Sequence, residues 1–290
     1  MSAADVFPPD VSTGPMCDAE VAELGDWAKA EGWNPGHGDL AVARAFDPEA
    51  FVALRRGGEM IGGGSIIRYG ESFGFMGLFI LRADARGLGL GGAFWRWRLD
   101  RLRARLAPDA AIGMDGVYHM APFYRRGGFV DAFRHLRLQG VARGASDPDA
   151  VREPAALLPD LCAFDRDVFP AARQAFLSAW IDRPGVRVSG IYGREGLRAY
   201  GVARPCAEGF KIGPFFARDA QAAERAFGDL LAGLSGEQVQ IDIPEVNEQA
   251  RALVDRHAMS EVFGCMRLYR GAPPECAAES IYGVTSLEFG

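Results

Sequence analysis

The chain of 290 residues carries 32 lysines and arginines against 38 aspartates and glutamates, a formal net charge of −6. This acidic balance argues against nucleic acid as the main partner, and no apolar run reaches the ~20 residues of a membrane span. The N-terminal segment lacks the basic flank and long apolar stretch of a secretory signal, so a cytoplasmic location is expected. The five cysteines are scattered and the four histidines form no i, i+4 pair, so no metal site is predicted.

In chain order, the first half begins with an irregular segment over residues 1–15 and continues as two helices and three antiparallel strands. The helices end at turn residues, and the strands are short apolar runs separated by glycine-containing turns. The expected helices cover residues 19–31 and 39–44, and the expected strands cover residues 51–56, 60–68 and 73–81.

A glycine-rich loop over residues 82–92 follows the third strand. From Ala93 onward, Trp95, Leu99 and Leu102 recur at helical spacing. A loop that opens a helix directs several backbone N–H groups, unpaired within the helix, toward one point, and the helix end adds a partial positive charge. The loop therefore predicts an anion site, most often a phosphate site. The arginines of the following helix are expected to form a solvated face.

Three phosphate loops compete for this stretch. A P-loop needs Gly-Lys-Ser/Thr at its end, which is absent. The dinucleotide fingerprint G-x-G-x-x-G is formally present at Gly87, Gly89 and Gly92, with Asp115 about 20 residues further on. However, five residues separate these glycines from the strand, and antiparallel strands precede it. The third loop is the acyl-CoA pyrophosphate loop, Arg/Gln-x-x-Gly-x-Gly/Ala, which Arg86, Gly89 and Gly91 match.

With its strand and helix, this loop resembles the GNAT superfamily of acyl-CoA N-acyltransferases. The resemblance implies acetyl-CoA as co-substrate and no metal, with Leu90 pointing inward to hold the turn. It also implies that Tyr124, which lies just before Gly-Gly-Phe129, protonates the departing thiolate, because a tyrosine pKa of ~10 lies close to that of a thiol. The implied cofactor-binding residues are Leu78, Phe79, Ile80, Arg86, Gly87, Leu88, Gly89, Leu90, Gly91 and Gly92.

The second half repeats the order of the first: helix, three strands, helix, strand, helix, strand. Residues 133–138 align with residues 263–268 at a constant offset of 130, which favours duplication. The counterpart of the glycine loop has no glycine and carries Asp219, whose carboxylate is expected to occupy the helix N–H groups. The apolar C-terminal tail is expected to dock as a strand or loop, with Thr285, Ser286 and Glu288 as candidates to face a cleft between the halves.

The sequence thus predicts an α/β (α+β) chain of two tandem GNAT-like domains, each a mixed, mostly antiparallel sheet flanked by helices. Residues 1–142 would form the acetyl-CoA domain and residues 150–290 a degenerate domain on the acceptor side. The expected function is N-acetylation of a primary amine of a small molecule or peptide by direct attack in a ternary complex. No nucleic acid or membrane partner is expected, and the sequence does not decide whether the protein forms a homodimer.

Two alternatives are a non-catalytic acyl-CoA sensor and a nicotinamide-dependent oxidoreductase. The residues do not identify a general base. Glu71 and Asp115 are candidates, although a turn carboxylate or a helix cap is the favoured interpretation of each.

Overall fold

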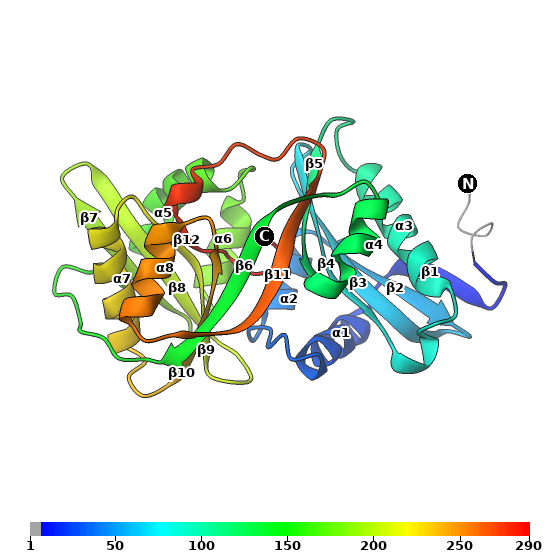
Figure 1. The fold of residues 1–290 in the computed structure, drawn as a ribbon, viewed down its shortest axis with the longest axis horizontal. Coiled ribbons are helices and arrows are strands. Elements are labelled where there is room, and N and C mark those ends of the chain that lie inside the picture. The colour runs from blue at the N-terminus through cyan, green and yellow to red at the C-terminus, as the bar shows by residue number, and fades with distance from the viewer. Residues whose placement is uncertain (1–6) are drawn as a thin grey trace.

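A computed structural model describes residues 7–290. Over these residues the strands form a single 12-stranded sheet in the order β1-β2-β3-β4-β5-β11-β6-β10-β9-β8-β7, with β12 attached to β9. Helices pack against the sheet in two lobes, and β6 and β11 run side by side between them (Figure 1). Among the described strands only β4–β5 and β9–β10 pair in parallel, which confirms a mixed, mostly antiparallel α/β architecture.

The first lobe contains the expected two helices and three strands before the loop. The segment over residues 1–15, predicted to be irregular, is partly ordered: Val11–Pro15 forms an edge strand that pairs with β2. Residues 1–6 of that segment lie outside the described residues. The elements are β1 (Val11–Pro15), α1 (Asp18–Ala30), α2 (Asp39–Phe46), β2 (Phe51–Arg56), β3 (Glu59–Tyr69), β4 (Phe73–Leu81), η2 (Ala83–Ala85), α3 (Leu90–Arg103), β5 (Ala111–Val117), η3 (Tyr118–Met120), α4 (Ala121–Arg126) and β6 (Val130–Val141).

The second lobe repeats this order from α5 onward, as the sequence predicts. Its first helix, α5, begins with Pro154 in its first turn, a position that proline favours. The elements are α5 (Pro154–Val168), α6 (Gln174–Ile181), β7 (Arg187–Gly193), β8 (Gly196–Pro205), β9 (Phe210–Ala217), α7 (Ala220–Ala232), β10 (Gln238–Pro244), α8 (Glu248–Arg256), β11 (Ser260–Arg270), η4 (Ala278–Ser280) and β12 (Ile281–Gly283).

The last long strands of the two halves are exchanged within the sheet. β6 ends the first half of the sequence, yet it lies between β11 and β10, both from the second half. β11 in turn lies next to β5 of the first half, with six residue pairs from Cys265 opposite Val117 to Arg270 opposite Ile112. The sheet is therefore continuous across the expected boundary at residues 142–150, and that boundary remains a proposal drawn from the sequence.

The exchange places equivalent residues of the repeat opposite one another. Cys265 on β11 pairs in register with His135 on β6, an offset of 130 residues. Two buried ion pairs flank this point: Arg137 binds Asp242 on the neighbouring β10, and Arg267 binds Asp115 on the neighbouring β5. The two arginines are 130 residues apart, the offset expected from a duplicated sequence.

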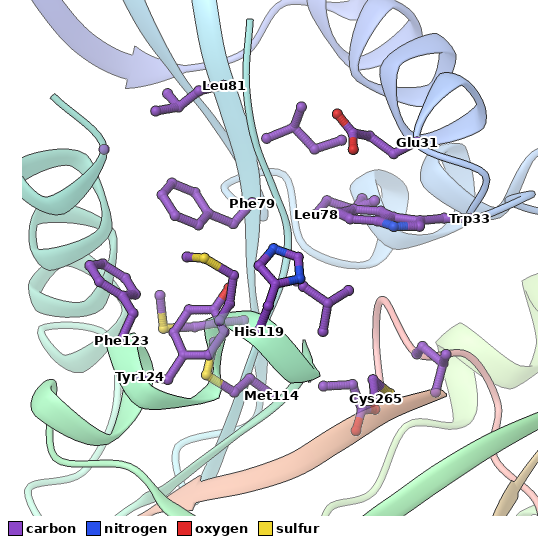
Figure 2. Close-up of a pocket in the computed structure, with 18 of the residues that line it drawn as sticks. Glu31, Trp33, Leu78, Phe79, Leu81, Met114, His119, Phe123, Tyr124 and Cys265 are labelled. Atoms are coloured by element: carbon purple, nitrogen blue, oxygen red, sulfur yellow. The ribbon is translucent and has the colours of Figure 1, made fainter. Parts of the chain in front are cut away.

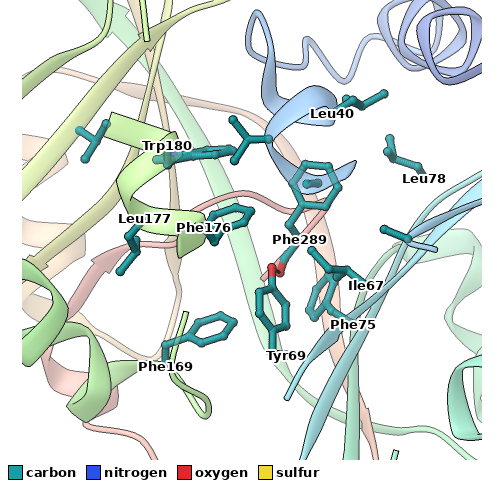
Figure 3. Close-up of a cluster of buried hydrophobic side chains, with 14 of the residues drawn as sticks. Leu40, Ile67, Tyr69, Phe75, Leu78, Phe169, Phe176, Leu177, Trp180 and Phe289 are labelled. Atoms are coloured by element: carbon teal, nitrogen blue, oxygen red, sulfur yellow. Dashed lines mark hydrogen bonds between the residues drawn. The ribbon is translucent and has the colours of Figure 1, made fainter. Parts of the chain in front are cut away.

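The largest hydrophobic cluster joins the two lobes. Phe176 and Trp180 of α6 face Ile67 and Phe75 of the first lobe, and Phe289 of the tail is buried between them (Figure 3). The hydroxyl of Tyr69 donates a hydrogen bond of 2.8 Å to the carbonyl oxygen of Phe289. Since burial of large apolar side chains is the main favourable term in folding, this shared core fixes the tail and the two lobes together.

Candidate functional site

A pocket opens where β4 and β5 separate. Their parallel pairing ends at Met76 opposite Met114, and the two strands then diverge. Just beyond Met76, β4 contains a bulge in its pairing with β3. Leu78 there has φ +50°, which is uncommon for a residue other than glycine. The cavity, about 990 Å³, is lined by the diverging strands, the glycine loop and parts of the second half.

The glycine loop forms one end of this pocket. Helix α3 begins at Leu90, three residues earlier than predicted, because Gly89 is its N-cap in the left-handed region at φ +77°. Gly91 and Gly92 therefore lie in the first helical turn, where N–H groups lack intrahelical partners. Gly87, Gly89, Gly91 and Gly92 all line the cavity. The local geometry is that of a helix N-terminus opening onto a cavity, which suits an anionic group.

Not all predicted cofactor residues line the cavity. Leu78, Phe79, Ile80 and Arg86 do, whereas Leu88 is 54% exposed and Leu90 is buried beneath the loop, as its expected inward orientation requires. Neither leucine side chain lines the pocket.

Arg86 bridges the loop to the end of α1. Its guanidinium donates a 2.6 Å hydrogen bond to Glu31 and a 2.8 Å hydrogen bond to the carbonyl oxygen of Leu81. Both charged side chains are largely exposed, so this ion pair contributes little to stability. Arg86 and its partner Glu31 both line the pocket.

Arg98 was expected on a solvated helix face, and this was wrong. It is buried beneath the bulge, where its guanidinium donates hydrogen bonds to the carbonyl oxygens of Ser65 (2.6 Å) and Gly77 (2.7 Å). Its Nε and Nη1 have no partner among the described residues, and burial lowers its pKa to about 10. The one feature of the sequence that matches this burial is Gly64, which faces the guanidinium. A Cβ at position 64 would lie 2.2 Å from Cζ of Arg98.

Tyr124 lies on α4 at the opposite wall from Trp33 (Figure 2). Its ring packs against Trp95 and Phe123, and the Cα of Gly116 lets it approach β5. Burial raises the pKa of Tyr124 to about 12, against a weaker opposing effect of Arg98. The phenol is therefore protonated at physiological pH. Its pKa lies above the value of ~10 from which the sequence argument started.

The far end of the pocket is built largely by the second half. Phe263, Gly264 and Cys265 of β11 and Leu287 and Glu288 of the tail line it, together with Trp33 and His119 of the first half. In Figure 2, Trp33 and Glu31 lie on one side of β4 and Phe79 and Phe123 on the other, with His119 between them. The expectation that tail residues face the cleft holds for Glu288; Thr285 and Ser286 are buried but do not line the pocket.

The two carboxylates considered as general bases have other surroundings. Glu71 is an exposed turn residue at the start of β4, whereas the pocket lies at the other end of that strand. Asp115 reaches the pocket wall but is a strand residue, neither a turn carboxylate nor a helix cap. It accepts hydrogen bonds from Arg267 (2.7 and 2.9 Å) and from His135 (2.9 Å). Burial would raise its pKa, yet Arg267 and His135 outweigh burial and hold it at about 2.

Asp115, His135 and Cys265 form a compact group whose potential ligand atoms lie within 4.8 Å of one another. The carboxylate is already paired with Arg267, and burial raises the pKa of the Cys265 thiol well above its usual range. A protonated thiol and a neutralised carboxylate are poor ligands for a cation.

The corresponding region of the second half is closed by the chain itself. At the start of α7, Asp219 accepts a 2.8 Å hydrogen bond from the N–H of Ala222, as expected from the sequence. The tail occupies the gap between β9 and β10: β12 pairs with β9, and the N–H of Val284 donates to the carbonyl oxygen of Asp242 on β10. In the first half the equivalent gap is the pocket described above.

Comparison with known proteins agrees with this architecture. Residues 161–283 match a family model described as an acetyltransferase (GNAT) domain. The chain is 27% identical over 270 residues to the holothin acyltransferase of Pseudoalteromonas sp. strain SANK 73390, covering 92% of this chain and 90% of the relative.

Two solved structures share the fold over nearly the whole chain. A Pyrococcus horikoshii protein described as a candidate acetyltransferase superposes with a TM-score of 0.82 at 21% identity, covering 98% of this chain and 97% of that one. A tandem GNAT protein from the clavulanic acid biosynthesis pathway gives 0.61 at 15% identity, covering 91% and 99%. These comparisons support an acyltransferase, with a match to a GNAT domain over residues 161–283 and a GNAT-type fold over nearly the whole chain. No helix among the described residues is long and apolar enough to cross a membrane.

Proposed function

We propose that the protein transfers an acetyl group from acetyl-CoA to the primary amine of a small molecule, by direct attack within a ternary complex. The observation that carries this proposal is one continuous cavity, with a helix N-terminus at one end and aromatic side chains from both halves at the other. Two substrates can occupy such a cavity together, and holding them in line supplies several kcal/mol through proximity alone.

The cofactor pyrophosphate is proposed to bind the N–H groups at the start of α3, across the residues from Arg86 to Gly92. Gly87 and Gly89 line the cavity and have open space where a Cβ would stand. The thioester would then lie along the splayed end of β4. There the backbone N–H groups near Leu78 are proposed to stabilise the oxyanion, as pre-organised donors do in acyl transfer.

Tyr124 is proposed to donate its proton to the sulfur as the C–S bond breaks. The phenol is buried and lines the cavity. A neutral donor facing the cavity is suited to stabilise a thiolate as it forms.

The acceptor is proposed to be a flat or apolar amine and not an extended peptide. Trp33 and Phe263 contribute aromatic surface, and Leu287 and Cys265 add apolar surface to the same end. The similarity to a holothin acyltransferase supports a small-molecule acceptor. A screen of amines would identify the acceptor of this chain.

Binding selectivity separates this proposal from the nicotinamide alternative. Calorimetry with acetyl-CoA and with NADH should give binding of acetyl-CoA alone. Gly89→Asp places a carboxylate at the loop and should weaken acetyl-CoA binding at least tenfold, since it repels phosphate and occupies the helix N–H groups.

Gly58→Asp is the matched control for that variant. Gly58 lies in the β2–β3 turn, also has positive φ and also has open space around its Cβ position, so it imposes the same backbone cost far from the pocket. Equal acetyl-CoA affinity in Gly89→Asp and Gly58→Asp would contradict the cofactor assignment. Thiol release from acetyl-CoA over a panel of amines then separates the enzyme from a sensor without turnover.

A further inference from the structure

The tail of the second half brings a carboxylate into the first half's pocket. After β12 fills the gap between β9 and β10, the chain crosses to β4, where the carbonyl oxygen of Glu288 occupies the position that a Cβ on Gly77 would need, 2.2 Å away. Glu288 lines the cavity next to the bulge at Leu78 and is only 6% exposed. The buried side chain of Phe289 and the Tyr69 hydrogen bond hold this segment in place.

Among the described carboxylates that line the pocket, Glu288 differs from the other two. Glu31 is paired with Arg86 at the loop end, and Asp115 is paired with Arg267 and His135. Glu288 has no cation within salt-bridge distance among the described residues, and its single side-chain partner is the hydroxyl of Ser286, which donates to Oε2. The other carboxylate oxygen thus remains available to a ligand.

We propose that Glu288 binds the acceptor's ammonium group and removes its proton before attack, so that it is the general base of the reaction. This role rests on the proposed function. A buried acceptor oxygen beside the point where the thioester would lie is placed to take a proton from an amine that enters from the Trp33 end. His119 lines the same pocket but is exposed, and no hydrogen bond among the described residues orients it.

The protons and bonds of this step balance. An ammonium acceptor gives one proton to Glu288, and the neutral amine attacks the thioester carbonyl to form the C–N bond. The C–S bond breaks and Tyr124 gives its proton to the sulfur. The second proton lost by the nitrogen restores Tyr124, and Glu288 releases its proton to solvent. The net products are the amide, free CoA and one proton.

The charged groups around Glu288 come from several strands. Arg137 on β6 and Lys211 on β9 interact with it, and Arg137 in turn is neutralised by Asp242 on β10. Burial lowers the pKa of Lys211 to about 8, and its ammonium group donates to the carbonyl oxygen of Trp33. Cys265 on β11 and His119 lie in the same cavity.

The test compares Glu288→Gln with wild type at a series of pH values, following CoA release with acetyl-CoA and the best amine of the panel. At neutral pH, kcat/KM for the amine should fall about 10²-fold or more. The loss should shrink as the pH approaches the amine's own pKa, ~10 for an alkylamine, since solution then supplies the neutral form. Acetyl-CoA affinity should stay within twofold of wild type.

Two further variants guard the interpretation. Glu279→Gln makes the same change at an exposed carboxylate of the tail and should retain wild-type rates. Ser286→Ala removes the hydrogen bond that orients Glu288 and should give a smaller loss with the same pH trend, even if Glu288→Gln fails to fold. Wild-type rates in Glu288→Gln, or in Ser286→Ala when only that variant folds, would overturn the role of Glu288 while leaving the transferase intact. A loss of equal size at every pH would do the same. Absence of any amine acylation by wild type would overturn the proposed function and this role together.

Discussion

Asp219 accepts a 2.8 Å hydrogen bond from the N–H of Ala222 at the start of α7. The equivalent start of α3 carries glycines and opens onto a cavity. A carboxylate at a helix N-terminus satisfies the same N–H groups and the same partial charge that would otherwise bind a phosphate. In the second half a side chain of the protein itself therefore caps the helix start, and the tail strand β12 fills the remaining gap.

This relationship predicts one acyl-CoA site per chain. Titration calorimetry of the intact protein with acetyl-CoA should give a stoichiometry of one. Two equivalent sites would mean that α7 also binds the cofactor and that the Asp219 cap is displaced by ligand.

Tyr124→Phe removes one donor and leaves the ring packing against Trp95 unchanged. Because the phenol is expected to act only in the transition state, kcat should fall about 10²-fold with little change in KM. Tyr192→Phe is the matched control, since its hydroxyl bonds Asp160 at the surface of the other lobe. Unchanged turnover in Tyr124→Phe, with chemistry rate-limiting, would remove Tyr124 from the mechanism.

The pH dependence of Tyr124 has a defined sign. Its pKa is raised by burial to about 12, so the phenol remains protonated through the neutral range and up to roughly pH 11. A loss of kcat between pH 8 and about pH 10 would then come from another group.

Asp115→Asn leaves Arg267 buried without a counter-charge. The free energy of unfolding should fall by about 3–5 kcal/mol, as for other broken buried pairs. Asp131→Asn, which breaks a surface pair with Arg125, should cost less than about 1 kcal/mol. Urea unfolding of the two variants measures both values, and equal losses would contradict the assigned role of the buried pair.

Asp115 should also account for part of the loss of stability at acid pH. Its folded pKa, about 2, lies below the ordinary value of 3.8, so its contribution is fully present above about pH 4. That contribution is lost as the pH falls from about 4 to about 2, since the unfolded chain then binds the proton first. Unfolding of Asp115→Asn should lack this portion of the pH dependence.

The exchange of β6 and β11 predicts that a fragment ending at Ala145 does not fold. In that fragment β6 would lose both of its neighbours, β11 and β10, and β5 would lose β11. Circular dichroism and size-exclusion chromatography should show an unfolded or aggregated chain. A stable monomer with the native sheet content would contradict the view that the halves complete one another.

Much of the fold was predictable because its signals are local. The strands from Phe51 to Leu81, the glycine loop and the order of elements in both halves follow from periodicity and turn residues, and the comparisons support the GNAT assignment. The offset of 130 residues also identified β6 and β11 as equivalent. It could not show that the two strands pair with each other, since pairing between distant strands leaves no local pattern.

The less predictable features of the site depend on tertiary contacts. Arg98 looks like its neighbours on a basic helix, and only the facing glycine and the strand carbonyl oxygens bury it. Asp115 resembles a catalytic or capping carboxylate until Arg267, 152 residues away in sequence, is beside it. Glu288 was one of three polar residues in an apolar tail, and the path of the tail decides which of them reaches the pocket.

The most direct test of the central claim is mass spectrometry of an amine panel incubated with acetyl-CoA and the intact protein. The proposed transferase predicts a product that is heavier than one of the amines by a single acetyl group, with one free CoA formed per product. Gly89→Asp should lower the rate of product formation at limiting acetyl-CoA at least tenfold, and Gly58→Asp should preserve it. Binding of acetyl-CoA without any acylated amine across the panel, or equal product in both variants, would contradict the account.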